Sequence, residues 1–317
     1  GEVLALVNEP DFNPNNRAGL RSGTFRNRAV TDLFEPGSTL KPFTVACALE
    51  SGKFSAGTVI DTTPGSLQIG DRTIRDVHNY GVLTVAGVIE KSSNVGASKI
   101  ALALNKKSLW EMLRHVGFGE TTGARLPGEV PGLLNPSSRW VPVEQASISF
   151  GYGISVTPLQ LARAYLVLAN DGEALPLTLL HADSPAQGER VMSVTTARRL
   201  QSMLELAVSD AGTGKAAQVA DYRVAGKTGT VRKLTAGGYS EEKYISWFAG
   251  FAPASSPRLV MVVAVDEPTR GGYYGGEIAA PVFGRVLTGA LRLLDVPPDA
   301  PRQSPRLMTV KSEQVAE

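Results

Sequence analysis

The chain is organised around the segment Glu35-Pro36-Gly37-Ser38-Thr39-Leu40-Lys41-Pro42. Pro36-Gly37 predicts a turn, and the residues after it predict a helix whose first turn carries Ser38. Residues three apart on a helix share a face, so the Ser38 hydroxyl and the Lys41 amine can meet there. A hydroxyl becomes a good nucleophile only when a neighbouring group takes its proton. The spacing therefore suggests a nucleophile and its base, although these four residues alone fit a helix N-cap and a solvated lysine better.

Composition describes an ordinary globular protein. The 317 residues are 43% hydrophobic and 20% charged, enough to bury a sizeable core. A net charge of +2 is too balanced for nucleic acid or an anionic membrane to be the main partner. The single cysteine, Cys47, excludes an intrachain disulfide and a cysteine-rich metal site, and its apolar helix predicts a buried thiol.

Hydrophobic periodicity and capping signals predict most of the helices. The clearest start is Thr157-Pro158-Leu159-Gln160, with an N-cap, a proline at the first helical position and a capping box. The segment 55–80 is rich in glycine, threonine and aspartate, so we expect it to be irregular. We expect helices at 38–50, 84–91, 95–104, 108–116, 157–170, 193–209 and 277–294.

Strands are expected at both ends of the helical region, at 3–7, 222–233, 244–252 and 258–266. The last three are joined by connections of hairpin length, so they should be antiparallel neighbours. Residues 259–265 are apolar at every position, which is typical of a central strand covered on both faces. The layout is α+β.

Two further motifs follow the serine segment. Ser92-Ser93-Asn94 lies in the break between two predicted helices, and Lys227-Thr228-Gly229-Thr230 lies in a predicted strand. Ser-x-x-Lys, a Ser-x-Asn type motif and Lys-Thr-Gly form the signature of penicillin-binding proteins and serine β-lactamases. Over residues 1–296 the chain closely resembles the transpeptidase domain of class B penicillin-binding proteins, of the division-specific type of Gram-negative bacteria. Other matching segments are 27–30, 34–42, 92–96, 149–153, 157–165 and 273–276.

The resemblance implies a penicillin-binding protein/serine β-lactamase-like α+β fold, with an antiparallel sheet flanked by helices. It also implies a mainly helical subdomain at about 53–190 and an active site in the cleft beside it. Residues 297–317, with four prolines and many polar side chains, are expected to be a disordered tail. No metal or cofactor is implied.

The motifs suit serine acyl transfer. A free lysine has a pKa of about 10.4, so a neutral amine costs about 4.6 kcal/mol at pH 7. For Lys41 to be the base, burial, the helix N-terminus and a second ammonium must lower its pKa. By resemblance Lys227 is that second cation, Ser92 relays a proton to the leaving amine, and Asn94 holds the substrate amide or Lys41.

The same resemblance implies a substrate site along the strand that carries the third motif. The N–H groups of Ser38 and Thr230 are the expected oxyanion hole. The Thr228 and Thr230 hydroxyls, with Lys227, suit a terminal carboxylate, to which Arg232 could add charge. Gly229 is expected to let the substrate backbone approach, and the strand edge to pair with an extended peptide. Tyr152, Tyr273 and Tyr274 resemble aromatic residues of the family's cleft, whereas Glu35 is expected to be structural.

The expected activity is peptidoglycan D,D-transpeptidation at the septum through an acyl-enzyme at Ser38. Expected partners are stem peptides ending in D-Ala-D-Ala, β-lactams as covalent inhibitors, and division-complex membrane proteins that include a septal glycan polymerase, but no nucleic acid. By resemblance the protein works at the periplasmic face of the inner membrane, anchored by an N-terminal segment absent from this chain.

Other functions fit the sequence less well or remain open. A phosphate-binding loop ending at Gly226-Lys227-Thr228 is rejected because position 221 is aspartate instead of glycine. A class A β-lactamase lacks support, since Pro131 occupies the place of the deacylating glutamate and Glu129 comes two residues too early. A D,D-carboxypeptidase and a non-catalytic β-lactam sensor remain open. A Ser-His-Asp triad has no support because the three histidines, His78, His115 and His181, lie in unrelated contexts.

Overall fold

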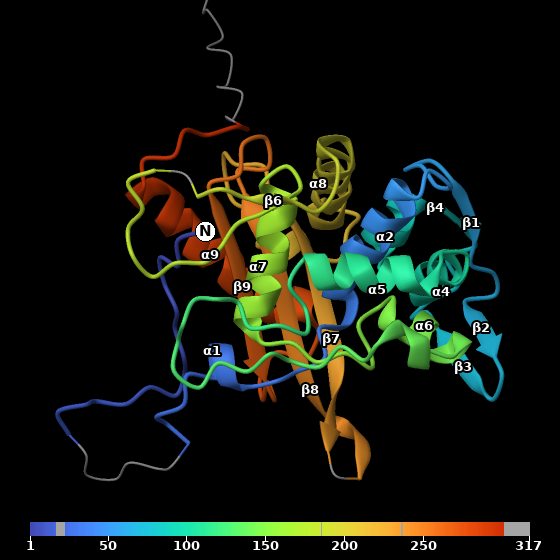
Figure 1. Ribbon diagram of the computed structural model, residues 1–317, viewed down its shortest axis with the longest axis horizontal. Coiled ribbons are helices and arrows are strands. Elements are labelled where there is room, and N and C mark those ends of the chain that lie inside the picture. Colours follow the sequence, from blue (N-terminus) through green and yellow to red (C-terminus); the bar gives the residue numbers. More distant parts are fainter. Residues whose placement is uncertain (17–22, 185, 236, 301–317) are drawn as a thin grey trace, which may run out of the picture.

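An antiparallel sheet lies at the centre of the computed structural model, which describes residues 1–16, 23–184, 186–235 and 237–300 (Figure 1). Its strands are β7 (Ala225–Thr235), β8 (Gly238–Ala252) and β9 (Leu259–Asp266), in the order β7-β8-β9. The predicted antiparallel neighbours are thus confirmed. The prediction of a central strand at 259–265 is wrong for the described sheet, since β8 occupies the centre and β9 pairs only with β8.

Both faces of the sheet are covered. Because strand side chains alternate, β8 sends Trp247 and Phe251 into one core and Phe248 and Ala252 into the other. The first core also contains α2 (Lys41–Glu50), α7 (Pro158–Ala169) and α8 (Val194–Val208), and the second contains α9 (Gly275–Leu293). Figure 1 shows α7 crossing one side of the sheet and α9 lying on the other.

The predicted helices are present, with ends that differ by a few residues. In α7 the Thr157 hydroxyl accepts from Gln160 N (3.1 Å) and the Gln160 side chain accepts from Thr157 N (2.8 Å), as a capping box requires. Cys47 is buried in α2, as predicted. Helices α1 (Arg28–Thr31) and α6 (Pro142–Ile148) were not predicted. The remaining helices are α3 (Val85–Lys91), α4 (Asn94–Leu102) and α5 (Lys106–His115).

Helices α4, α5 and α6 lie to one side of the sheet, with two small strand pairs at their outer edge (Figure 1). One pair joins β1 (Val59–Asp61) to β4 (Val82–Thr84), and the other is a hairpin of β2 (Ser66–Ile69) and β3 (Arg72–Arg75). The expectation of an irregular segment at 55–80 is therefore wrong. The hairpin turns at Gly70, whose φ of +53° suits a two-residue turn.

The predicted strand at 3–7 is also absent. This segment pairs with another part of the chain at one point only among the described residues. Glu2 forms an isolated bridge with Thr178, and Val3 N donates to Thr178 O at 2.8 Å. Val3 and Leu6 pack against a small cluster that includes Val30. An apolar alternation predicts a strand only when a partner strand accepts its hydrogen bonds, and the sequence pattern could not show whether one does.

The remaining elements are short. Strands β5 (Glu173–Ala174) and β6 (Glu189–Arg190) pair with each other, and single 3₁₀ turns occur at Ser137–Arg139 and Lys215–Ala217. Of the predicted tail, Asp299 accepts hydrogen bonds from Arg223 N and Ser255 Oγ, both at 2.7 Å. Residues 301–317 lie outside the described residues. Within the described ranges, each helix is too short or too polar to cross a lipid bilayer.

Candidate active site

Ser38 lies on a 3₁₀ turn, Gly37–Leu40, that runs directly into α2 at Lys41. The α-helix predicted from Ser38 therefore begins three residues later. Residues three apart eclipse each other in a 3₁₀ turn, which brings Lys41 Nζ to 3.0 Å from Ser38 Oγ. The turn requires Gly37, because its φ is +55° and a Cβ there would lie 2.4 Å from the Val231 side chain.

The first two predicted motifs converge on the Lys41 amine, which is completely buried. Its Nζ donates to Asn94 Oδ1 at 2.8 Å and lies 3.2 Å from Ser92 Oγ, and it also contacts the Ser92 carbonyl. Ser92 occupies the break between α3 and α4 with a left-handed φ of 61°. Ser93 then caps α4 by accepting from Gly96 N at 2.8 Å. This break turns both Ser92 and Asn94 toward Lys41.

The third motif lies beside the serine turn, although it is about 190 residues away in the sequence. Lys227 is completely buried in β7, and its Nζ lies 3.3 Å from Thr228 Oγ1 and 3.4 Å from Thr213 Oγ1. A Cβ on Gly37 would be 3.9 Å from Thr230 N, so the expected oxyanion donors of Ser38 and Thr230 belong to adjacent segments.

Gly229 lies where β7 packs against the serine turn. A Cβ at this position would lie 3.0 Å from both Pro36 O and Thr39 Cγ2, and 3.1 Å from the Trp247 side chain. The absent side chain therefore makes room for the serine turn to pack against β7. The expected role of Gly229 in admitting the substrate backbone stays a prediction.

The two buried amines have lowered pKa values. Burial lowers the pKa of Lys41 well below that of a free lysine, and the charge of Lys227 lowers it further, while Asp76 opposes the change. Burial alone brings the pKa of Lys227 to about 7. A neutral amine at 3.0 Å from a hydroxyl can take its proton, so Lys41 has the geometry and the electrostatics of a base for Ser38.

Thr230 lies beside the start of α9, which two of the predicted tyrosines precede. The Thr230 hydroxyl accepts from Gly275 N at 2.9 Å, directly after Tyr273 and Tyr274 at the start of α9. Tyr273 stacks on Tyr244 of β8 with ring centroids 4.1 Å apart, and both Tyr273 and Tyr274 are exposed. Thr228 is buried, and its hydroxyl lies 2.7 Å from that of Thr213. Arg232 is exposed and pairs with Tyr244 across the sheet.

Tyr152 is half-buried and packs against Tyr239 and Phe150, with centroids 5.6 and 5.5 Å apart. Glu35 lies nearby and joins three segments: its Oε1 accepts from Gly153 N (2.7 Å) and from the Tyr239 hydroxyl (2.9 Å). Its carbonyl accepts from Trp247 Nε1 at 3.2 Å. These contacts agree with a structural role for Glu35, and burial raises the pKa of its carboxyl.

Asp76 was missed in the sequence. Its carboxylate accepts from Ser93 Oγ at 2.6 Å, from Asn94 N and from Val95 N at 3.0 Å. The only sequence signal was an acidic residue 16 positions before the second motif, in a segment expected to be irregular.

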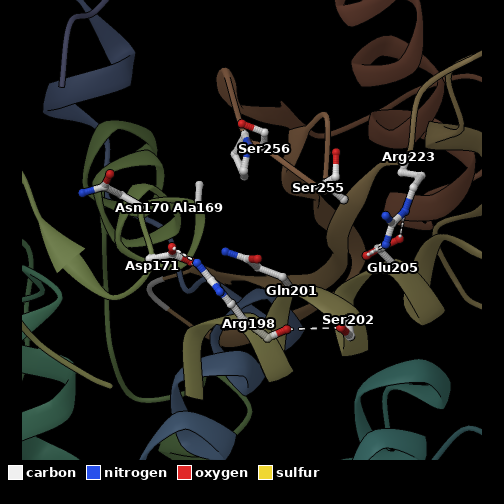
Figure 2. A pocket seen from close by; sticks show the side chains of 12 residues that line it. Ala169, Asn170, Asp171, Arg198, Gln201, Ser202, Glu205, Arg223, Ser255 and Ser256 are labelled. Atoms are coloured by element: carbon white, nitrogen blue, oxygen red, sulfur yellow. Dashed lines mark hydrogen bonds and ion pairs between the residues drawn. The ribbon is translucent and has the colours of Figure 1, made fainter. Parts of the chain in front are cut away.

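A separate cavity of about 600 Å³ lies between the C-terminal end of α7 and the middle of α8 (Figure 2). Two ion pairs border it, Arg198 with Asp171 and Arg223 with Glu205. None of its lining residues belongs to the three motifs. Within the described ranges, no group of three or more acidic, histidine or cysteine side chains is arranged to hold a metal ion.

Comparison with known proteins agrees with this geometry. The family model of the penicillin binding protein transpeptidase domain matches residues 1–288. The chain belongs to this family. As a member of the penicillin-binding protein transpeptidase family, it has the predicted mixed α+β fold with an antiparallel sheet.

Named relatives refine the assignment. The chain is 45% identical to the probable peptidoglycan D,D-transpeptidase PbpC of Pseudomonas aeruginosa over 96% of its own length and 54% of that protein. It is 44% identical to the peptidoglycan D,D-transpeptidase FtsI of Escherichia coli K12 over 95% of its length and 51% of that protein. The chain therefore spans about half the length of these curated relatives.

The solved transpeptidase domain of Burkholderia pseudomallei penicillin-binding protein 3 superposes with a TM-score of 0.84 and 46% identity, over 87% of this chain and 84% of that one. The predicted resemblance to penicillin-binding proteins of the division-specific type 3 is confirmed by these names.

Proposed function

We propose that this domain is the catalytic part of a peptidoglycan D,D-transpeptidase that cross-links stem peptides during septal wall synthesis. The observation that carries the proposal is the 3.0 Å contact between the Ser38 hydroxyl and the completely buried amine of Lys41. The names of the relatives PbpC and FtsI support the same activity.

In the acylation step, Ser38 Oγ attacks the carbonyl between the two terminal D-alanines of a donor stem peptide, while neutral Lys41 takes the hydroxyl proton. The N–H groups of Ser38 and Thr230 hold the oxyanion that forms. When the C–N bond breaks, D-alanine leaves with a proton passed through Ser92, whose hydroxyl lies 3.2 Å from Lys41 Nζ. The donor then remains bound as an ester of Ser38.

In the second step an amine of a neighbouring stem peptide attacks the ester, and the same groups transfer protons in the opposite direction. The acceptor amine forms the new amide and Ser38 regains its proton. A β-lactam imitates the terminal dipeptide, but its amine stays attached after the ring opens. The drug therefore traps Ser38 as a long-lived ester.

Substrate recognition is assigned to β7 and the start of α9. Protonated Lys227 and the Thr230 hydroxyl bind the terminal carboxylate, and a bound carboxylate raises the pKa of Lys227 again. Thr228 contributes through the hydroxyl pair that it forms with Thr213. Arg232 adds positive charge beyond Thr230, and three tyrosines contact the peptide: Tyr152, Tyr273 and Tyr274. Asn94 holds the donor amide while its Oδ1 fixes Lys41.

The cellular setting is proposed on the resemblance. The complete protein is anchored in the inner membrane through a segment outside this chain, faces the periplasm, and works with division proteins that include a septal glycan polymerase. A D,D-carboxypeptidase would use the same acyl-enzyme with water as acceptor, and a sensor would stop at acylation. The three activities differ in the fate of the ester.

The test supplies a donor peptide ending in D-Ala-D-Ala with an amine acceptor and identifies the products by mass spectrometry. Transpeptidation predicts free D-alanine and a donor–acceptor product in comparable amounts. A shortened donor without the acceptor product would indicate a carboxypeptidase, and neither product would indicate a sensor. Ser38→Ala should abolish both products, whereas the matched control Ser55→Ala, at an exposed serine, should leave them unchanged.

A further inference from the structure

Asp76 binds the start of the helix that carries the second motif. It follows β3 directly, and its carboxylate accepts hydrogen bonds from Asn94 N, from Val95 N at 3.0 Å and from Ser93 Oγ at 2.6 Å. Two of these donors are the first N–H groups of α4, which have no partner within the helix. A carboxylate at a helix N-terminus also interacts favourably with the helix dipole. Asp76 therefore fixes where α4 begins.

The residue before it holds the Asn94 side chain. Asn94 Nδ2 donates to Arg75 O at 3.1 Å, which turns Oδ1 of the same amide toward Lys41 Nζ at 2.8 Å. Without that carbonyl the amide could rotate and present its NH₂ group to the lysine. The segment Arg75-Asp76 thus holds Asn94 through both its backbone and its side chain.

We propose that Asp76 is a positioning residue of the reaction: its carboxylate binds Ser93 and the start of α4, which keeps Ser92 and Asn94 against Lys41, and its negative charge acts on the buried Lys41 amine. The inference rests on the proposed function, because it assigns Asp76 a part in the acylation of Ser38. Asp76 acts through α4 and contacts neither the hydroxyl of Ser38 nor Lys41.

The charges around Lys41 determine in which direction its pKa changes when Asp76 is replaced. Lys227, on β7, lowers the pKa of Lys41, whereas Asp76 raises it. The other groups that contact the amine are neutral: Ser38 of the serine turn, Ser92 in the break between α3 and α4, and Asn94 of α4. Burial raises the pKa of Tyr80, and the charge of Asp76 raises it further. Removal of the negative charge should therefore make Lys41 neutral at a lower pH.

Two substitutions separate the charge from the hydrogen bonds. Asp76→Asn keeps the shape of the side chain, since its amide oxygen can still accept from Asn94 N and Val95 N while its NH₂ group faces Ser93 Oγ. Asp76→Ala removes all three bonds. Asp71→Asn is the matched control, because it removes the same charge from an exposed turn of the same hairpin.

The experiment measures the second-order rate constant for acylation of the whole chain by a fluorescent penicillin between about pH 5 and 9. For Asp76→Asn we expect the acidic limb of the pH–rate profile to move to lower pH by about half a unit or more. The maximum rate constant on the plateau of this profile should fall about three- to tenfold. Asp76→Ala should lower the plateau by about ten- to a hundredfold. Asp71→Asn should reproduce the wild-type profile.

A lower plateau with an unmoved acidic limb in Asp76→Asn, or a profile identical to the wild type, would overturn the inference. If Asp76→Ala fails to fold, Asp76→Asn still decides, since it keeps the bonds to α4. Failure of the wild type to be acylated would defeat the proposed function itself, and so the two failures are distinguishable.

Discussion

The amines of Lys41 and Lys227 are both buried in the same site, and burial disfavours the charged form of each. A protein gains little stability from such an arrangement. Its use is chemical, because an amine that is neutral near pH 7 can remove a proton from Ser38 at 3.0 Å. The hydrogen bonds from Nζ to Ser92 and Asn94 hold that amine in line with the hydroxyl.

Replacing Lys41 by methionine should preserve the volume of the side chain and remove the base. We expect the rate of acylation by penicillin to fall by about 10² to 10⁴, the usual contribution of a general base. Stopped-flow fluorescence with a labelled penicillin measures this rate. An acylation rate within a few-fold of the wild type would show that another group takes the Ser38 proton.

The lowered pKa of Lys227 makes stability depend on pH. An unfolded lysine keeps a pKa of about 10.4, whereas burial brings that of Lys227 to about 7. Between about pH 7 and 9.5 the unfolded state therefore binds more protons, so the free energy of unfolding should rise with pH. Lys227→Met should flatten this rise by up to about 1.4 kcal/mol per pH unit, measured by urea unfolding.

The control for this measurement is Lys107→Met, because the Lys107 side chain is 74% exposed. It should leave the slope unchanged. An equally steep rise in Lys227→Met and the wild type would mean that Lys227 is protonated in the folded protein throughout this range.

The serine turn, β7 and the loop after α6 form one unit through contacts between their backbones. Gly37 N donates to Gly151 O at 3.1 Å, and a Cβ on Gly151 would lie 2.1 Å from Gly37 O. On the opposite side, Gly229 leaves room for the same turn. Any side chain at these glycines would displace Ser38.

Gly151→Ala should therefore destabilise the protein by about 3 kcal/mol or more and slow acylation, because a clash adds to a φ of +87°. Gly52→Ala is the matched control: its φ is +69°, but a Cβ there meets no atom within 4 Å. The control should cost about 1 kcal/mol and leave acylation unchanged. Chemical denaturation and penicillin labelling measure the two effects, and equal losses would exclude the clash as the cause.

The elements that the sequence predicted are those whose signals are local. Thr157 and Gln160 cap α7 as their spacing required, and the three motifs marked the residues around Lys41. Helix α6 also carries local signals, since Pro142 stands at its first position and the Glu144 carboxylate accepts from Val141 N at 2.9 Å.

What the sequence could not predict depends on partners that are distant in the chain. The strands of the pairs β1–β4 and β2–β3 are short, and their residues show no clear alternation of apolar and polar side chains. The roles of Gly229 and Asp76 follow from what each faces, the serine turn and the start of α4, and no spacing rule reveals either. The absence of a strand at 3–7 likewise reflects pairing and not propensity.

At the scale of the whole molecule, the sheet separates two cores, and the helix that follows the serine turn, α2, packs in one of them. Trp247 lies in the core shared with α2 and donates to Glu35 O, three residues before Ser38. Phe283 lies in the core beneath α9. Both side chains are completely buried. Packing in the first core is therefore coupled to the position of the nucleophile.

Trp247→Phe should lower both stability and the acylation rate, the latter by about tenfold, because Glu35 O loses its donor beside the serine turn. Phe283→Leu should lower stability by about 1–2 kcal/mol and leave the rate unchanged. Thermal unfolding and penicillin labelling of both variants check this. An equal loss of rate in Phe283→Leu would contradict the separation of the two cores.

The central claim is that the three motifs converge to make Ser38 the nucleophile of a slow-deacylating acyl-enzyme. The intact mass of the protein after incubation with benzylpenicillin tests it most directly, with peptide mapping of the modified residue. The account predicts one persistent adduct with the mass of the whole drug, located at Ser38 and absent from Ser38→Ala. An adduct that persists in Ser38→Ala, no adduct in the wild type, or rapid release of hydrolysed drug would contradict it.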